Sequence, residues 1–90
     1  MKKTVISVVG KDKVGIIYKV CEYLAGNQIN ILDIAQTIVQ EYFNMIMIVN
    51  IEETQKDFAT IDSELKQIGE EIGVNITLQQ EEIFNMMHRL

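Results

Sequence analysis

The order in which strand-like and helix-like segments alternate is the strongest constraint on the fold of this 90-residue chain. Two stretches place apolar residues three and four positions apart, which is the period of a helix. Four others are rich in β-branched residues, as strands are. The segments follow as strand, helix, strand, strand, helix and strand, over residues 4–9, 14–27, 29–40, 43–52, 54–73 and 74–79. This order is typical of the split ferredoxin-like motif. The sequence therefore predicts an α+β sandwich with a four-stranded antiparallel sheet and both helices on one face.

The helical stretch over residues 54–73 has the clearest apolar period in the chain. Its apolar residues recur at spacings of three and four: Phe58, Ile61, Leu65, Ile68 and Ile72. Thr54, with Asp57 three positions later, predicts the N-terminal cap of this helix. Gly73 predicts its C-terminal end, because glycine readily adopts the left-handed conformation that ends many helices.

The predicted sheet is apolar on both faces near its centre. A sheet covered by helices on one face should alternate apolar and polar residues, yet Ile46 and Ile48 face away from their apolar neighbours in the stretch 43–52. Something must cover this second face, because an exposed apolar sheet favours aggregation. The candidates are residues 81–90, expected to form a short C-terminal helix after a domain over residues 1–80, a second copy of the chain, or both. We expect a homodimer, since two-fold dimers are the commonest assemblies.

The composition argues against several classes of partner. The net charge of −5 disfavours nucleic-acid binding, which needs a basic surface. No apolar segment reaches the length of a membrane span, and the apolar run after the first lysines is too short for a signal peptide. A single cysteine, Cys21, permits no internal disulfide and fits a reducing cytoplasm, which is the expected location.

The stretch VVGKDKVGII, residues 8–17, joins the first predicted strand to the first predicted helix. The helix is expected to begin near Val14, which places Asp12 or Lys13 at its N-cap. One interpretation is a tight turn capped by Asp12. The other is a ligand site, because the first N–H groups of a helix lack internal partners and accept an anion such as a carboxylate. A nucleotide phosphate loop is excluded, since isoleucines follow the second glycine where Lys and Ser or Thr are needed.

This stretch, the segment NQINILDIAQ over residues 27–36, and the order of elements together resemble an ACT domain over residues 2–80. More narrowly, the chain resembles the small stand-alone bacterial ACT proteins, which are little else than one such domain. Glycine-cleavage regulators and the N-terminal module of formyltetrahydrofolate deformylases look similar. The resemblance implies a small-molecule sensor, mostly for amino acids. It also implies that two copies pair side by side, with ligands at the interface between them.

The resemblance further implies which residues would bind an amino acid. The carboxylate would bind N–H groups of the loop, the ammonium group would bind Asp12, and the amide of Asn30 from the neighbouring copy would bind either group. Asp33 is expected on the face opposite to Asn30. The predicted ligand-binding residues are Gly10, Lys11, Asp12, Lys13, Val14, Gly15, Ile16 and Asn30.

Nothing in the sequence indicates catalysis, a metal or a cofactor. Cys21 lies on the apolar stripe of its helix, where an inert buried thiol is expected. His88 is the only histidine, and no second metal ligand stands three or four residues away. We therefore expect a non-enzymatic regulatory module that binds a small molecule, with an amino acid as ligand and a protein as target. The alternative is a structural protein–protein interaction module without a ligand.

Overall fold

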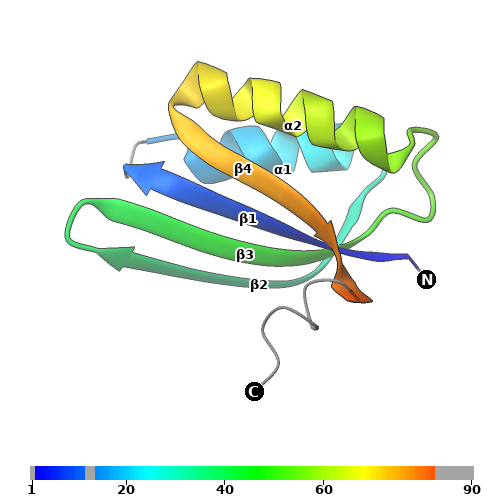
Figure 1. Cartoon of the computed structure of the whole chain (residues 1–90), viewed down its shortest axis with the longest axis horizontal. Helices are drawn as coiled ribbons and strands as arrows, with labels where there is room; N and C mark the ends of the chain where they lie inside the picture. Colours follow the sequence, from blue (N-terminus) through cyan, green and yellow to red (C-terminus); the bar gives the residue numbers. More distant parts are fainter. Residues whose placement is uncertain (1, 12–13, 83–90) are drawn as a thin grey trace.

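The structure is a computed structural model that describes residues 2–11 and 14–82. Its elements follow in the order β1 (Lys3–Lys11), α1 (Ile16–Gly26), β2 (Asn30–Val39), β3 (Tyr42–Asn50), α2 (Phe58–Ile72) and β4 (Val74–Gln80). This order confirms the ferredoxin-like α+β fold expected from the sequence (Figure 1). Residues 83–90, most of the expected C-terminal helix, lie outside the described residues.

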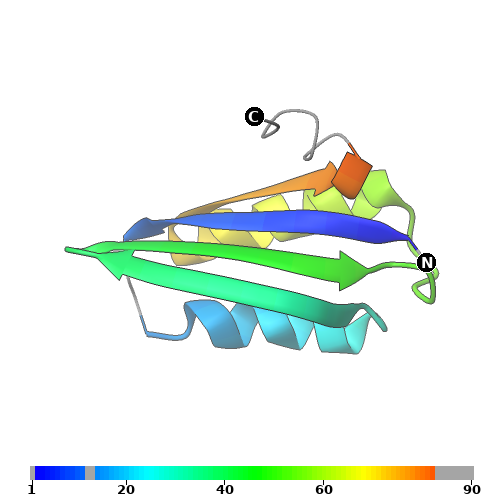
Figure 2. The ribbon, with the colours of Figure 1, turned by 90° about the horizontal axis from the view of Figure 1, so that it is seen from below.

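The four strands form one antiparallel sheet in the order β2-β3-β1-β4, so β2 and β4 are its edges. Both helices lie on the same side of this sheet (Figures 1 and 2). We call this side the helix face and the other side the open face. A two-residue turn, Gln40 and Glu41, joins β2 to β3, because Val39 pairs directly with Tyr42. Gln40 has a φ of 58°, as expected for a tight hairpin turn.

The core lies between the helix face and the two helices. Alternate residues of β3 and β4 point into it and are buried, whereas the residues between them are more exposed. From the helices, Val20 and Leu24 of α1 and Leu65 of α2 are fully buried against the sheet. The strand residues of the core are Ile6, Val8, Phe43, Met45, Met47, Val49, Val74, Ile76 and Leu78.

Both helices begin later than the sequence predicts. Asp57 caps α2, because its Oδ1 accepts a hydrogen bond from the Thr60 N–H at 2.9 Å. Thr54, the predicted cap, instead accepts a bond from the Lys56 N–H within the preceding loop, at 3.3 Å. The prediction was wrong because residues 54–57 are polar in a way that suits a helix start and a loop equally well.

A β-bulge interrupts the pairing of β2 with β3. Ile31 pairs with Val49 and Asp33 pairs with Ile48, so Leu32 is an extra residue without a cross-strand partner. The bulge places Asn30 and Asp33 on the same face of the sheet, the open face. The prediction that they lie on opposite faces was therefore wrong, because simple alternation does not hold across a bulge.

Candidate functional site

The predicted loop lies where β1 ends and α1 begins. Asp12 and Lys13 lie outside the described residues. Lys11, the last residue of β1, is exposed and pairs with Tyr42, and Val14 is fully exposed. Ile16 is only 2% exposed and packs into the core, so its backbone alone is available to a ligand.

Gly10 is part of β1, and its size is explained by packing. The prediction that the strand ends at residue 9 was wrong, because Gly10 pairs with Phe43 on one side and with Val74 on the other. A Cβ atom at Gly10 would lie 2.8 Å from Val74 Cγ1 and 3.0 Å from its Cα. Glycine therefore lets β1 and β4 stay close at this end of the sheet.

The N-terminus of α1 begins at a glycine rather than at an acidic cap. Gly15 is the N-cap, with φ 95° and ψ −2°, and it forms no side-chain cap hydrogen bond. The expectation that Asp12 or Lys13 is the N-cap was thus wrong, since only glycine adopts this left-handed conformation easily. The first helical bond runs from the Lys19 N–H to the Gly15 carbonyl at 2.9 Å. The N–H groups before Lys19 therefore form the positive end of the helix, which attracts an anion.

Asn30 lies at the opposite end of the sheet from this loop. Asn30 pairs with Asn50 of β3, which pairs in turn with Lys3 of β1. Gly10, near the loop, pairs with Phe43 at the other end of β3. Lys3 and Gly10 are seven residues apart on one strand, which is about 24 Å at roughly 3.4 Å per residue. A single chain therefore does not bring Asn30 and the loop together.

The edge strand β2 exposes an unusual amount of apolar surface. Its exposed apolar side chains are Leu32 at 38%, Ile34 at 44%, Ile38 at 54% and Val39 at 62%. Within the described part of the chain, no strand pairs with the outer side of this ten-residue strand. Proteins normally shorten, charge or cover such an edge, because it can pair with another chain.

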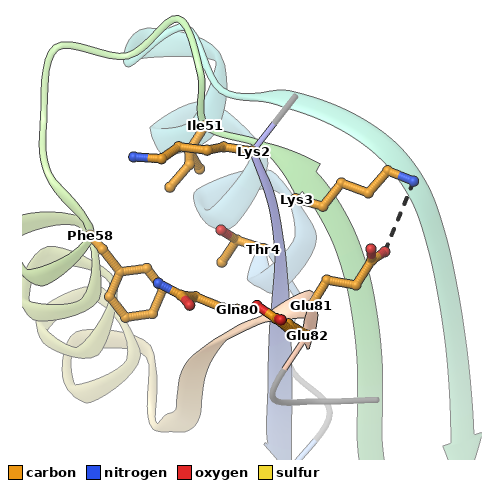
Figure 3. A pocket seen from close by; sticks show the side chains of 8 residues that line it. All are labelled: Lys2, Lys3, Thr4, Ile51, Phe58, Gln80, Glu81 and Glu82. Carbon is orange, nitrogen blue, oxygen red and sulfur yellow. Dashed lines mark ion pairs between the residues drawn. The ribbon is translucent and has the colours of Figure 1, made fainter. Parts of the chain in front are cut away.

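The structure has pockets that sequence reasoning missed. One has a volume of about 480 Å³ and lies at the end of the sheet away from the loop (Figure 3). Its lining residues are Lys2, Lys3, Thr4, Ile51, Phe58, Gln80, Glu81 and Glu82. A second, of about 310 Å³, lies beside the C-terminal end of α1. Neither is lined by a predicted site residue. Their linings join segments far apart in the chain, which no local motif reveals.

A polar cluster joins the two helices near the second pocket. The Tyr23 hydroxyl donates to Glu64 Oε1 at 2.6 Å, and Lys56 Nζ donates to the same oxygen at 2.6 Å. The hydrogen bond from Lys56, with that from Tyr23, lowers the pKa of Glu64. Burial, with the bond to Glu64, raises the pKa of Tyr23 well above its ordinary value. The cluster connects α1, the loop before α2, and α2 itself.

The described part of the chain offers no metal centre. Over residues 2–11 and 14–82, no three His, Cys, Asp or Glu residues come together in a way that could hold a metal ion. Cys21 is half-buried and packs against the core. His88 lies outside the described residues. Among the helices that the structure describes, none is long and apolar enough to cross a membrane.

A family model described as ACT domain matches residues 2–79. A UPF0237 protein of Bifidobacterium longum is 51% identical to the chain over 90 residues, which is 100% of both proteins.

Solved structures agree with this match. An ACT domain protein from Streptococcus pneumoniae is 38% identical, with a TM-score of 0.81, over 92% of this chain and 93% of that one. The regulatory subunit of aspartate kinase from Thermus thermophilus is 28% identical, with a TM-score of 0.68, over 90% of this chain and 52% of that one. Formyltetrahydrofolate deformylases also share the fold, as the sequence resemblance implied.

Proposed function

The chain belongs to the ACT-domain family, and from this premise we propose that it is a non-enzymatic regulatory module that binds an amino acid between two copies. ACT domains are in general regulatory modules for small molecules, above all amino acids. The two copies would pair along β2 and form one continuous sheet. A bound amino acid would then stabilise the dimer, and a protein target would distinguish the dimer with the amino acid from the dimer without it.

The exposed apolar edge of β2 is the observation that carries this proposal. A second copy, related by a two-fold axis, would cover Ile34 and Ile38 and pair with the free edge of the strand. Antiparallel pairing of two β2 strands would bring Asn30 of one copy to the Val39 end of the other. Val39 and Lys11 both pair with Tyr42, so that end lies two strand spacings, about 10 Å, from Lys11, where the loop before α1 begins. The separation of about 24 Å within one chain therefore fits a site shared by two copies.

The chemistry of the two half-sites suits an amino-acid zwitterion. The N-terminus of α1, where the N-cap Gly15 has no side chain to cap the helix, offers N–H groups and a positive dipole end to the carboxylate. Asp12 would accept hydrogen bonds from the ammonium group. The amide of Asn30, on the open face of the neighbouring copy, can donate to the carboxylate or accept from the ammonium group.

A thermal-shift screen of the twenty amino acids tests the proposed ligand class. One or a few of them should raise the melting temperature at millimolar concentration, because a ligand that binds only the folded state stabilises it. A flat screen with an intact dimer would contradict amino-acid sensing and favour the interaction module without a ligand.

Mixing two variants tests whether the site is shared. Asp12→Ala and Asn30→Ala should each abolish the thermal shift of the identified amino acid, while Glu70→Ala, an exposed residue of α2, should leave it unchanged. In a mixture of the first two variants, a mixed dimer has one complete site, formed by the loop of one chain and the asparagine of the other. Part of the shift should therefore return on mixing. A shift that survives in Asp12→Ala, or does not return on mixing, would place the ligand elsewhere.

A further inference from the structure

The open face of the sheet is covered at one end only. Val5 and Val9 both lie on this face of β1, yet Val5 is 2% exposed and Val9 is 45% exposed. The cross-strand neighbours of Val5 are Ile48 and Gln79. Cross-strand neighbours stand beside a side chain and not above it, so they leave its tip accessible. The burial of Val5 therefore requires a group that lies over this end of the face.

The C-terminal end of β4 lies at the same end of the sheet. Gln80 pairs with Thr4, so the chain leaves the sheet one residue from Val5. Lys3 lies on the open face, and its Nζ forms an ion pair with Glu81 Oε2 at 4.0 Å (Figure 3). The last described residues, orange-red in Figure 1, lie below the strands, on the side away from the helices. The chain is thus directed toward the open face where the described residues end.

The eight residues that follow are suited to cover an apolar surface. Their sequence is IFNMMHRL, and its apolar residues stand at helical spacing: Ile83, Phe84, Met86, Met87 and Leu90. We propose that residues 83–90 dock on the open face over Val5 and Ile48, so that the chain covers part of its own sheet. Eight residues span about 12 Å as a helix, and β3 lies two strand spacings, about 10 Å, from β4. The segment is therefore long enough to reach Ile48.

The burial of Val5 favours this occupant over a second copy of the chain. Val5 is 2% exposed in a single copy, so the group that covers it belongs to the same chain. In that same single copy Ile46 is 38% exposed and Val9 is 45% exposed. Burial is confined to the end where the chain leaves β4, which suits a short segment attached there.

Methyl NMR of the full-length chain tests the docking. The variant Ile83→Ser/Phe84→Ser/Met87→Ser removes the apolar side of the segment, and Asn85→Ser/His88→Ser is a matched control with polar positions changed. The methyl signals of Val5 and Ile48 should shift in the first variant and stay in place in the control. The signals of Val9 and Ile46 should stay in place in both, because these residues lie beyond the reach of the segment.

Three outcomes of the NMR experiment would overturn the proposal. The signals of Val5 and Ile48 could stay unchanged in the triple variant, or shift equally in the control. They could also shift when the unmodified chain is diluted, which would identify a second copy as the cover.

Urea unfolding gives an independent measurement. When Val5→Ala is combined with the triple variant, the unfolding constant should be about threefold to tenfold smaller than the product of the two separate effects predicts, because the two changes remove one shared contact. If the effects of Val5→Ala and of the triple variant on the unfolding constant simply multiply, the proposal is also overturned. Val9→Ala is the control, because its effect should multiply with that of the triple variant.

Discussion

Gly69 packs closely against β4, a role that the sequence does not reveal. A Cβ atom at this position would lie 2.6 Å from the Val74 carbonyl oxygen and 3.2 Å from Ile76 Cγ1. Because the nearer atom belongs to the backbone, the strand or the helix must move to make room. Gly26 near the end of α1 differs, since a Cβ atom there would meet nothing within 4 Å.

We predict opposite effects of alanine at these two glycines. Gly69→Ala should lower the free energy of unfolding by about 1–3 kcal/mol, because overpacking outweighs the better helix propensity of alanine. Gly26→Ala should raise it by about 0.4–1 kcal/mol, since alanine restricts the unfolded chain and meets no clash. Urea unfolding monitored by circular dichroism measures both. A Gly69→Ala variant at least as stable as the unmodified chain would show that α2 can move away from β4 without cost.

At the scale of elements, the cluster of Tyr23, Lys56 and Glu64 gives the contact between α1 and α2 a pH dependence. The folded state lowers the pKa of Glu64, so its contribution to stability is present above the ordinary glutamate pKa of about 4.5 and is lost as the pH falls below it. The folded state raises the pKa of Tyr23, so that contribution is lost as the pH rises above the ordinary value of 10.0.

We predict that Glu64→Gln makes the chain lose less stability than the unmodified chain does as the pH falls. The variant should melt at a lower temperature than the unmodified chain at pH 7, and this difference should shrink as the pH falls from 5 to 3, because protonated Glu64 no longer pairs with Lys56. Melting curves over this pH range measure the effect. Glu71→Gln, an exposed position on the same helix, is the control. A constant gap across the range would contradict a role for the charge of Glu64.

The helical elements could be predicted from apolar spacing, but their first residues could not. Phe58, Ile61 and Leu65 mark the buried side of α2 in the sequence as they do in the structure. The start of α1 depends on the left-handed backbone of Gly15, which depends on the path of the chain and not on the pattern of side chains. The polar residues at the start of each helix could likewise cap the helix or stabilise a loop.

At the scale of the whole molecule, the candidate site could be predicted only in part. The sequence predicts the loop and Asn30 as its members, and the structure places them at opposite ends of one sheet. A linear pattern does not reveal this separation, because it depends on strand order and register. The pocket around Thr4 and Phe58 was missed for the same reason: its walls come from the start of β1, the residue after β3, the start of α2 and the end of β4 with the two residues that follow it.

We predict that Ile38→Lys on β2 prevents association of the chain with a second copy. A charge at this exposed apolar position would be buried without a partner if two β2 edges paired. Thr77→Lys, at an exposed position on the other edge strand, should leave the assembly unchanged. Light scattering after size-exclusion chromatography measures the mass in solution. A dimer that tolerates Ile38→Lys but dissociates with Thr77→Lys would place the interface along β4 instead.

The bulge adds a residue, Leu32, that the pairing of β2 with β3 does not require. If Leu32 were deleted, Ile31 and Asp33 would become consecutive in the ladder, and each could keep its partner on β3. The sheet could thus close with one residue fewer. The additional residue instead changes the direction of the strand at its beginning, where Asn30 lies. A chain without Leu32 would keep the same fold, but the side-chain amide of Asn30 would point in a different direction.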